Sequence, residues 1–345
     1  MATYQGIHGR PIRAVSSDLS GAAAEGEVWY NTASNVLKVM YPFTGWATAD
    51  ALVTASRGGG TCGTATLALY AGGTTGPAGI SGADKTEEYD GTSWATAPAT
   101  LTQRRTEGCM FGIQTSAVIY GGRINDGNPG PTYTTIATEE YDGTSWSAGG
   151  NYPLIVTTSG GAGVLTAGLG ATGYTTPGDP GTDTPVSAEY NGTSWTAGNP
   201  VLTARRDVNV GPQGTQTAAL LIDGRVATTH QSVTEEYDGT SWATAGSTTA
   251  TQRCAMVFGT QTSALSGFGT QGGPVPSVVC NTYDGTSWSV APSGGTARYF
   301  IGGAGTSSTT GLAMGGAILS PAPGRVALVE EFSSGGVEVK TISTS

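Results

Sequence analysis

The sequence predicts an all-β protein, a six-bladed β-propeller that follows a short N-terminal segment. A segment of the form Glu-Tyr-Asp-Gly-Thr-Ser-Trp, with single replacements in two copies, recurs five times. The copies end at Trp94, Trp146, Trp195, Trp242 and Trp288. Successive copies are 46 to 52 residues apart, and a degenerate sixth copy spans residues 330–337. A period of this length is typical of propeller blades.

Each repeat is expected to form four short strands. An apolar run that ends in Gly, such as residues 66–73 or 116–122, precedes each motif by about 20 to 25 residues. A Gly-Thr-Gln-Thr-like turn precedes the run in several copies, and an Arg usually precedes that turn. The Asp-Gly pair of the motif indicates a two-residue hairpin, because both positions tolerate positive φ. A repeat therefore contains strands a, b, c and d, with Tyr on strand c and Trp on strand d.

The composition excludes several classes of protein. Of 345 residues, 56 are Gly, a weak helix former, so the composition disfavours helices. Only 12% of the residues are charged. The hydrophobic fraction of 37% is too high for a disordered chain. The formal charge of −10 and the lack of a basic cluster argue against nucleic acid as a partner. No apolar stretch is long enough for a membrane helix, and the N-terminus has no apolar signal-peptide core.

The repeats resemble Kelch repeats in their paired glycines after strand b, as at Gly72-Gly73, their Tyr on strand c and their Trp on strand d. The glycine pair is eroded in blades three to five, and the resemblance covers residues 52–343. It implies that the repeated aromatic side chains pack between adjacent blades. These blade-packing residues are Trp94, Trp146, Trp195, Trp242, Trp288, Tyr89, Tyr141, Tyr190, Tyr237 and Tyr283.

The segment before the repeats reads as two strands, within 26–32 and 36–41, joined by a polar turn. Its pattern Gly-Glu-Val-Trp-Tyr-Asn-Thr is similar to segments of tail-fibre and other virion proteins of marine phages, where it precedes Kelch-like Gly-Thr-Ser-Trp repeats. The expected domains are an extended arm (1–25), an anchoring β-hairpin (26–50) and the propeller (51–345).

Trp46 leaves an alternative open. It either ends the independent hairpin or lies on an outer strand that closes the ring, and residues 27–49 could also form an incomplete seventh blade. We favour the independent hairpin, because residues 337–342 read as strand d of blade six.

No constellation of an enzyme is found, so we expect no catalytic residue, metal or cofactor. The two histidines, His8 and His230, are too few for a copper oxidase of the Kelch type. The motif Ser has no His partner at a fixed spacing. The repeated Asp is a turn residue, because Asn191 replaces it in one copy and Gly always follows. The four cysteines have no metal-ligand spacing, and we expect buried thiols.

The acidic doublets that open strand c, such as Glu139-Glu140, suggest an ion pair within each blade. Blade three loses both the first Glu and the Arg expected before strand a. Blade five has an Arg but no doublet, so it breaks the rule. The candidate arginines are Arg57, Arg105, Arg206, Arg253 and Arg298.

The b–c connections vary widely in sequence, and recognition usually resides in variable loops on a rigid scaffold. The candidate binding face comprises Tyr133, Asn125, Asp126, Tyr174, Asp179, Asp183 and His230. We expect a phage virion protein made in the host cytoplasm, a tail-fibre or receptor-binding component. The alternatives are a head-decorating virion protein, a cellular Kelch-type protein-interaction module or a secreted carbohydrate-binding or enzymatic propeller.

The expected partners follow from this assignment. The N-terminal segment would bind other virion proteins, and the variable loops would bind a host cell-surface glycan or protein. We expect a homo-oligomer on the particle, with neither nucleic acid bound nor insertion into a membrane.

Overall fold

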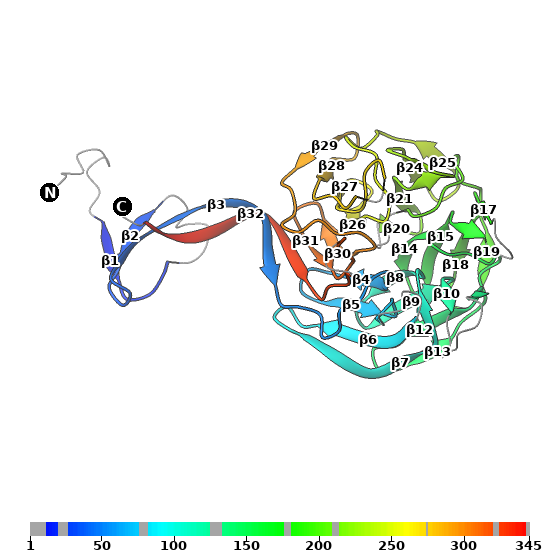
Figure 1. Ribbon diagram of the computed structural model, residues 1–345, viewed down its shortest axis with the longest axis horizontal. Coiled ribbons are helices and arrows are strands. Elements are labelled where there is room, and N and C mark those ends of the chain that lie inside the picture. The colour runs from blue at the N-terminus through cyan, green and yellow to red at the C-terminus, as the bar shows by residue number, and fades with distance from the viewer. Residues whose placement is uncertain are drawn as a thin grey trace. The chain divides into compact units, whose positions relative to one another are not determined.

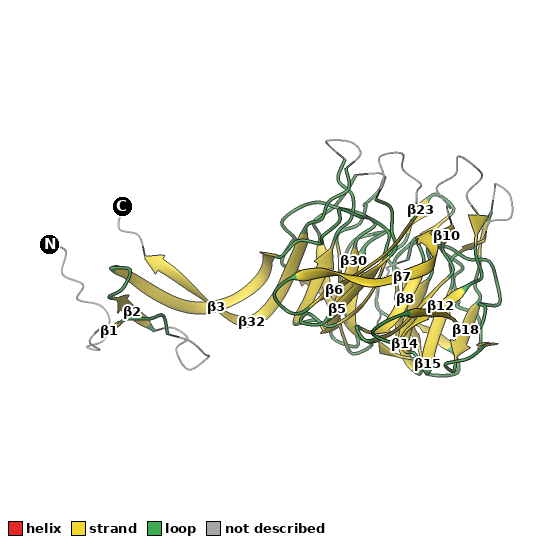
Figure 2. Ribbon diagram, turned by 90° about the horizontal axis from the view of Figure 1, so that it is seen from below, coloured by secondary structure: helices red, strands yellow, loops and turns green. Residues whose placement is uncertain are grey.

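The computed structural model describes residues 12–19, 27–75, 82–124, 133–175, 181–208, 214–273, 275–319 and 324–342. Every regular element within these ranges is a β-strand, which confirms the all-β prediction (Figure 2). The chain divides into two compact units, unit 1 (Met1–Thr44 and Ser333–Ser345) and unit 2 (Gly45–Phe332). Each unit is described by itself below.

Unit 2 contains one antiparallel sheet for each repeat, called blades one to six in chain order, and Figure 1 shows the sheets side by side around a common axis. In blade one, strands a to d are β4 (Gly60–Gly63), β5 (Ala68–Ala71), β6 (Ala83–Tyr89) and β7 (Trp94–Thr106). In blade two they are β8 (Cys109–Ile113), β9 (Ser116–Tyr120), β12 (Thr138–Tyr141) and β13 (Trp146–Ala148). In blade three they are β14 (Gly160–Val164), β15 (Ala167–Ala171), β18 (Ser187–Tyr190) and β19 (Trp195–Ala197).

Blades four and five repeat the pattern with β20 (Gly214–Thr215), β21 (Ala218–Ile222), β24 (Thr234–Tyr237) and β25 (Trp242–Thr244), then β26 (Met256–Thr260), β27 (Ser263–Gly267), β28 (Cys280–Tyr283) and β29 (Trp288–Ala291). Blade six contains β30 (Gly302–Ser307), β31 (Thr310–Met314) and the ends of two long strands, β32 (Val329–Ile342) and β3 (Val36–Ala49). The b–c loops add β10 (Arg123–Ile124), β11 (Tyr133–Thr134), β16 (Tyr174–Thr175), β17 (Thr182–Asp183), β22 (Arg225–Val226) and β23 (Thr229–His230).

The c–d hairpin turns at the Asp-Gly pair as expected, but its loop has four residues, 142–145 in blade two, and only the Gly has positive φ, so the predicted two-residue turn is wrong. In blade two, Asp142 Oδ1 accepts hydrogen bonds from the backbone N–H groups of Thr144 and Ser145 at 2.8 and 2.7 Å. Gly143 has φ of 90°, which glycine adopts without strain. The turn places Tyr141 opposite Trp146 on the paired strands c and d. Asn191 accepts the same two hydrogen bonds in blade three, so the turn does not need a charge.

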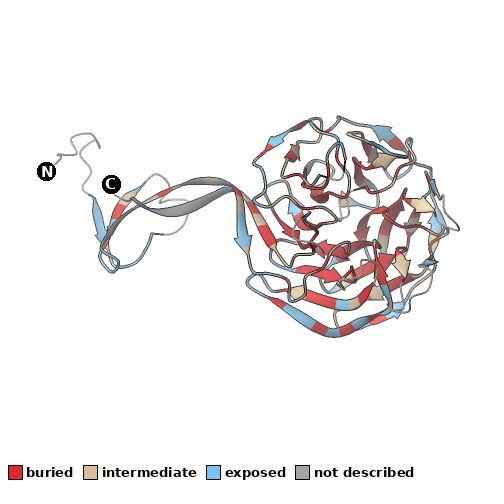
Figure 3. Ribbon diagram, in the orientation of Figure 1, coloured by how far each residue is buried: buried red, intermediate tan, exposed pale blue. Residues whose placement is uncertain are grey.

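The repeated aromatic residues lie between neighbouring blades. Within each blade the Tyr and Trp rings have centroids 4.8–5.1 Å apart. The indole N–H of Trp146 donates to Thr86 Oγ1 of the preceding blade at 2.9 Å, and the Tyr141 hydroxyl donates to Glu88 there at 2.8 Å. All ten predicted packing residues are buried except Trp195, which is half-buried. Figure 3 shows the burial concentrated on the inner strands.

Trp46 takes the same role in blade six, contrary to the independent hairpin favoured from the sequence. The residues of β3 from Gly45 onward belong to unit 2, and β3 neighbours β32 in the sheet. The Trp46 ring contacts Phe258, Phe268 and Phe332, with centroids 5.1–6.4 Å apart. The boundary expected at residue 50/51 therefore shifts to Thr44/Gly45, because burial of this indole holds the last β3 residues against blades five and six.

The prediction of residues 337–342 as strand d of blade six is wrong. They continue the single strand β32, and residues 333–342 belong to unit 1. The last residues of the 27–49 segment lie on β3, which neighbours β32 in the sheet that also contains β31 and β30. The sequence could not show this, since a degenerate sixth motif without Trp does not indicate that the indole comes from the other end of the chain.

Unit 1 contains β1 (Arg13–Val15), β2 (Val28–Asn31) and parts of β3 and β32. The β2–β3 hairpin was expected, whereas β1 pairs parallel to β2 within the region expected as an extended arm. Trp29 and Met40 form the small core. Asp18 accepts hydrogen bonds from Asn31 and Lys38 at 2.6 Å each. Residues 1–11 and 20–25 of that arm lie outside the described residues.

Buried ion pairs join strand c to the segment before strand a in alternate blades. They are Arg105–Glu139, Arg205–Glu235 and Arg298–Glu330. Two of the predicted arginines, Arg105 and Arg298, are therefore in place, but Arg205 rather than Arg206 forms the third pair. Blade five is no exception to the rule, because neutral Gln252 and Asn281 occupy the two positions together and both are buried.

Candidate functional site

The two ends of unit 2 differ in what they present to solvent. The turn end carries the a–b and c–d turns, and the loop end carries the b–c loops and the d–a connections. At the turn end, Gln114, Gln216 and Gln261 each donate from Nε2 to two backbone carbonyls of the preceding blade. The side chains of these turns therefore hold neighbouring blades together.

The turn end has a hollow of about 300 Å³ at the axis. Its described lining consists of Gly, Thr, Ala, Ile, Val and Gln residues, with no charged side chain. Gly259 is one of six glycines there, and its φ of 116° is required by the turn. A Cβ at Gly259 would lie 2.2 Å from the carbonyl oxygen of Ser263. The sequence at this end is therefore dictated by backbone geometry and offers no group for chemistry.

At the loop end, equivalent residues from the six blades surround the axis. They are Gly58, Glu107, Thr158, Asp207, Cys254 and Phe300, all with φ between 51° and 63°. Backbone hydrogen bonds of 2.7–3.0 Å join five of the six neighbouring pairs, which are Gly58–Glu107, Glu107–Thr158, Asp207–Cys254, Cys254–Phe300 and Phe300–Gly58. The side chains differ while the backbone geometry repeats, so the strained φ values serve the hydrogen bonds rather than a reaction.

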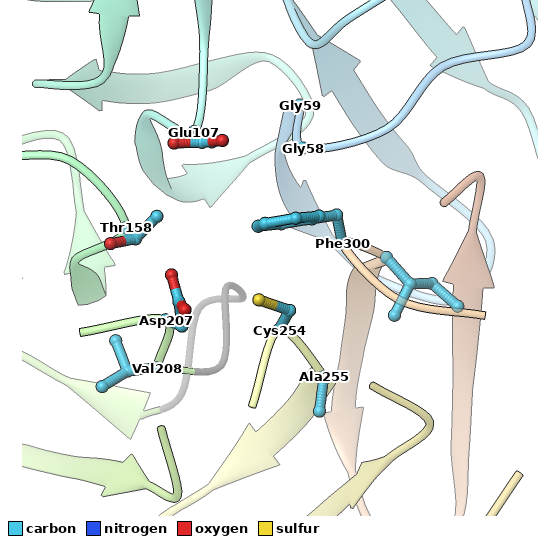
Figure 4. Close-up of a pocket in the computed structure, with 10 residues that line it drawn as sticks. Gly58, Gly59, Glu107, Thr158, Asp207, Val208, Cys254, Ala255 and Phe300 are labelled. Atoms are coloured by element: carbon cyan, nitrogen blue, oxygen red, sulfur yellow. The ribbon is translucent and has the colours of Figure 1, made fainter. Parts of the chain in front are cut away.

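Figure 4 shows the pocket that these axial residues line. Its volume of about 20 Å³ has room for roughly one water molecule. Glu107 is ion-paired to Arg123 at 2.8 Å, and Asp207 to Arg225 at 2.6 Å. Burial raises the pKa of the Cys254 thiol well above its ordinary value, with Asp207 adding to the shift. This pocket cannot take an organic substrate, and its thiol is protonated at neutral pH.

A larger pocket lies beside the axis between blades four and five. It has a volume of about 530 Å³ and is lined by Arg225, Thr228, Thr229, His230, Thr251, Arg253, Gly272 and Gly273. Arg253 Nε donates to His230 Nε2 at 2.8 Å, and its Nη1 is 2.9 Å from Asp207. Burial lowers the pKa of His230, and the neighbouring Arg253 and Arg225 lower it further. We call this site the basic pocket.

A second cluster lies between blades three and four. The Arg206 guanidinium stacks over the Tyr174 ring at 4.0 Å and is ion-paired to Asp183 at 2.9 Å. Tyr174 and Asp183 lie on the paired strands β16 and β17, so the hairpin of the loop orients both. The three side chains contact one another and are half-buried.

The structure brings together only some of the predicted binding residues. Tyr174 and Asp183 meet through Arg206, His230 lies in the basic pocket, and Tyr133 lies apart from both with 63% of its surface exposed. Asn125, Asp126 and Asp179 lie outside the described residues. Arg225 and Asp207 were not among the predicted residues, although an Arg directly follows the strand-b glycine in two blades, at Gly122-Arg123 and Gly224-Arg225.

The described residues contain no group of three or more His, Cys, Asp or Glu side chains placed to hold a metal ion. Within the same ranges there is no helix with the length and apolar character needed to cross a membrane.

Comparison with known proteins bears on the fold alone. No family model matches the sequence, and no curated protein matches it significantly. Among solved structures, the chain is similar to that of YjhT, with a TM-score of 0.67 and 11% sequence identity over 85% of this chain and 99% of the other. YjhT has a β-propeller-type fold, and the described residues of this chain share that all-β, propeller-type architecture.

Proposed function

We propose that this chain is a non-enzymatic structural protein of a phage virion, a tail-fibre or receptor-binding component whose loop end binds the host surface. The observation that carries the proposal is the contrast between the two ends of unit 2. Turn-end side chains are used to join blades, whereas the loop end presents blade-specific Arg, His and Tyr side chains. The resemblance of the repeats and of residues 26–40 to marine phage virion proteins supports the virion assignment.

The proposal includes a closed ring of six Kelch-like blades. In support, the inner strands contact one another in the order β4, β8, β14, β20, β26, β30 and back to β4. The hydrogen bond from Gly58 N to Phe300 O joins the first blade to the last at 2.9 Å. Trp46 supplies blade six with the indole that its own motif lacks.

The absence of a reaction is also part of the proposal. The repeated Asp carboxylates accept hydrogen bonds from their own turns, as Asp142 does, and the axial pocket holds about one water molecule. Burial raises the pKa values of Cys109 and Cys280 to about 12, so neither thiol is a nucleophile at neutral pH.

Unit 1 is proposed as the attachment to other virion proteins. Segments from both ends of the chain lie in this one small unit, which has its own core of Trp29 and Met40. An anchor of this kind leaves unit 2 to bind a partner, and several copies on one particle would raise the avidity of weak contacts.

The test is immunoelectron microscopy on particles from the organism that encodes the chain, with antibody raised against the full chain. We expect label on the tail fibres or tail tip, and we expect an excess of purified chain to slow adsorption of particles to host cells. Label confined to the head would support a decorating protein instead. Particles that lack the chain would contradict the proposal.

A further inference from the structure

In the basic pocket, cationic side chains converge without enough acid to neutralise them. Two guanidinium groups, Arg225 and Arg253, share the single carboxylate of Asp207. His230 accepts a hydrogen bond from Arg253, and its lowered pKa keeps it neutral near pH 7. The pocket therefore carries one excess positive charge in a protein whose formal charge is −10.

The geometry leaves donors for a ligand. Asp207 is contacted by Nε of Arg225 and Nη1 of Arg253. In the described part of the chain, no acceptor is found for the two terminal nitrogens of Arg225 or for Nη2 of Arg253. The Asp207 carboxylate and the His230 ring fix the direction of both guanidinium groups, so little side-chain entropy is lost when an anion binds.

The rest of the lining matches a polyhydroxylated ligand. Thr228, Thr229 and Thr251 are exposed and present hydroxyl groups, and a Cβ at Gly272 or Gly273 would meet nothing within 4 Å. The volume of about 530 Å³ lies within the range of small-molecule sites, about 300–1,000 Å³. A saccharide unit fits both the size of the pocket and its supply of hydroxyl and backbone groups.

We propose that the basic pocket binds an anionic saccharide unit, with its carboxylate or sulfate held by Arg225 and Arg253 and its hydroxyls by the threonines. The inference rests on the proposed function, because it names the chemical class of ligand that the loop end recognises. Fixed guanidinium pairs recognise planar carboxylate and sulfate oxygens through charge-assisted hydrogen bonds.

The test is calorimetric titration of the purified full chain with glucuronate and with galactose 6-sulfate, against glucose and inorganic sulfate. At least one of the two anionic sugars is expected to bind about tenfold more tightly than either control. If glucose binds as tightly as the anionic sugars, the pocket does not recognise the charge. If inorganic sulfate binds as tightly, the pocket does not recognise the sugar. Either result, or no binding at all, overturns the proposal.

The variants separate the pocket from the rest of the loop end. The double variant R225Q/R253Q is expected to lose at least about tenfold in affinity, as is T251E, which adds a carboxylate to the lining without removing an ion pair. R123Q is the matched control, because Arg123 holds the equivalent position in blade two and is ion-paired to Glu107. Unchanged affinity in a folded T251E variant, or an equal loss in R123Q, would contradict the assignment.

This titration is independent of the particle. Saccharide binding by a chain that is missing from virions would refute the proposed function and leave the pocket assignment standing. A chain found on tail fibres that binds neither anionic sugar would do the reverse.

Discussion

The turn end and the loop end of unit 2 are built from the same repeat, yet they use it in opposite ways. At the turn end, Gln114 and its equivalents bond to the preceding blade, and Asp142 and its equivalents bond to their own turns. At the loop end, equivalent backbone positions carry Glu107, Asp207 and Cys254, each with different partners. Repetition therefore marks where side chains are needed for packing, and variation marks where side chains are not needed for packing and, in our proposal, bind a partner.

The largest effect is expected from breaking the packing on which both ends depend. Trp46→Ala removes a half-buried indole that packs against the core cluster between blades five and six, and we expect a loss of about 3–5 kcal/mol, as for other large aromatics replaced by Ala. Thermal unfolding followed by circular dichroism measures the loss. Val290→Ala is the control, because that side chain is 73% exposed on the neighbouring strand β29.

The same reasoning applies to truncation. A chain that begins at Ala51 lacks the last strand of blade six and is expected to lose cooperative unfolding. If the shortened chain has the same melting temperature as the full-length chain, Trp46 does not complete the blade. A W46A variant of unchanged stability would lead to the same conclusion.

The next effect concerns the buried ion pairs near the loop end. Glu235→Ala leaves the Arg205 charge buried without its partner, which costs about 3–5 kcal/mol in comparable sites. The double variant R205V/E235A copies the Val156 and Ala188 of blade three and is expected to regain most of that stability. Denaturant unfolding of the natural chain, E235A, R205V and R205V/E235A gives the coupling energy directly, and additive losses would exclude the pairing.

A matched pair of glycine substitutions compares the two ends at equal chemistry. Gly259→Ala at the turn end meets the Ser263 carbonyl at 2.2 Å with φ of 116°, and we expect a loss of about 3 kcal/mol. Gly272→Ala at the loop end has φ of 56° and open space around it, so about 1 kcal/mol is expected. Comparable losses in chemical denaturation would refute the difference in constraint.

The repeat carried enough information for the strands and the turns. The Asp-Gly turn and the pairing of Tyr on strand c with Trp on strand d depend only on residues close together in sequence. The c–d hairpins could therefore be predicted from single blades. The role of Trp46 was not, because it depends on which chain end meets blade six. Arg205 and Arg206 are adjacent in sequence, and only the path of the connection between β19 and β20 places Arg205 in the core and leaves Arg206 half-buried.

The basic pocket was predictable only through His230. Arg225 and Arg253 are 28 residues apart in sequence and come from different blades, so their convergence on Asp207 depends on how neighbouring blades pack. Loop variability indicated the end of unit 2 at which this pocket lies but could not show which side chains meet.

The smallest effect concerns pH. Hydrogen bonds within the turns lower the pKa values of Asp90, Asp142 and Asp238 to about 2, below the value of about 3.9 in an unfolded chain. A lowered folded-state pKa adds stability above pH 4 that is lost as the pH falls toward 2. The triple variant D90N/D142N/D238N should therefore lose less melting temperature over this interval than the natural chain. An identical pH profile would show that these turns do not contribute.

The proposed roles of the two ends, binding at the loop end and blade packing at the turn end, are tested most directly by binding of the labelled full chain to host cells. Two folded variants are compared with the natural chain, R225Q/R253Q at the loop end and D142N/D238N at the turn end. The account predicts that the loop-end variant loses at least about tenfold in cell binding while the turn-end variant binds as the natural chain does. Loss of binding in the turn-end variant, with the loop-end variant unaffected, would contradict it.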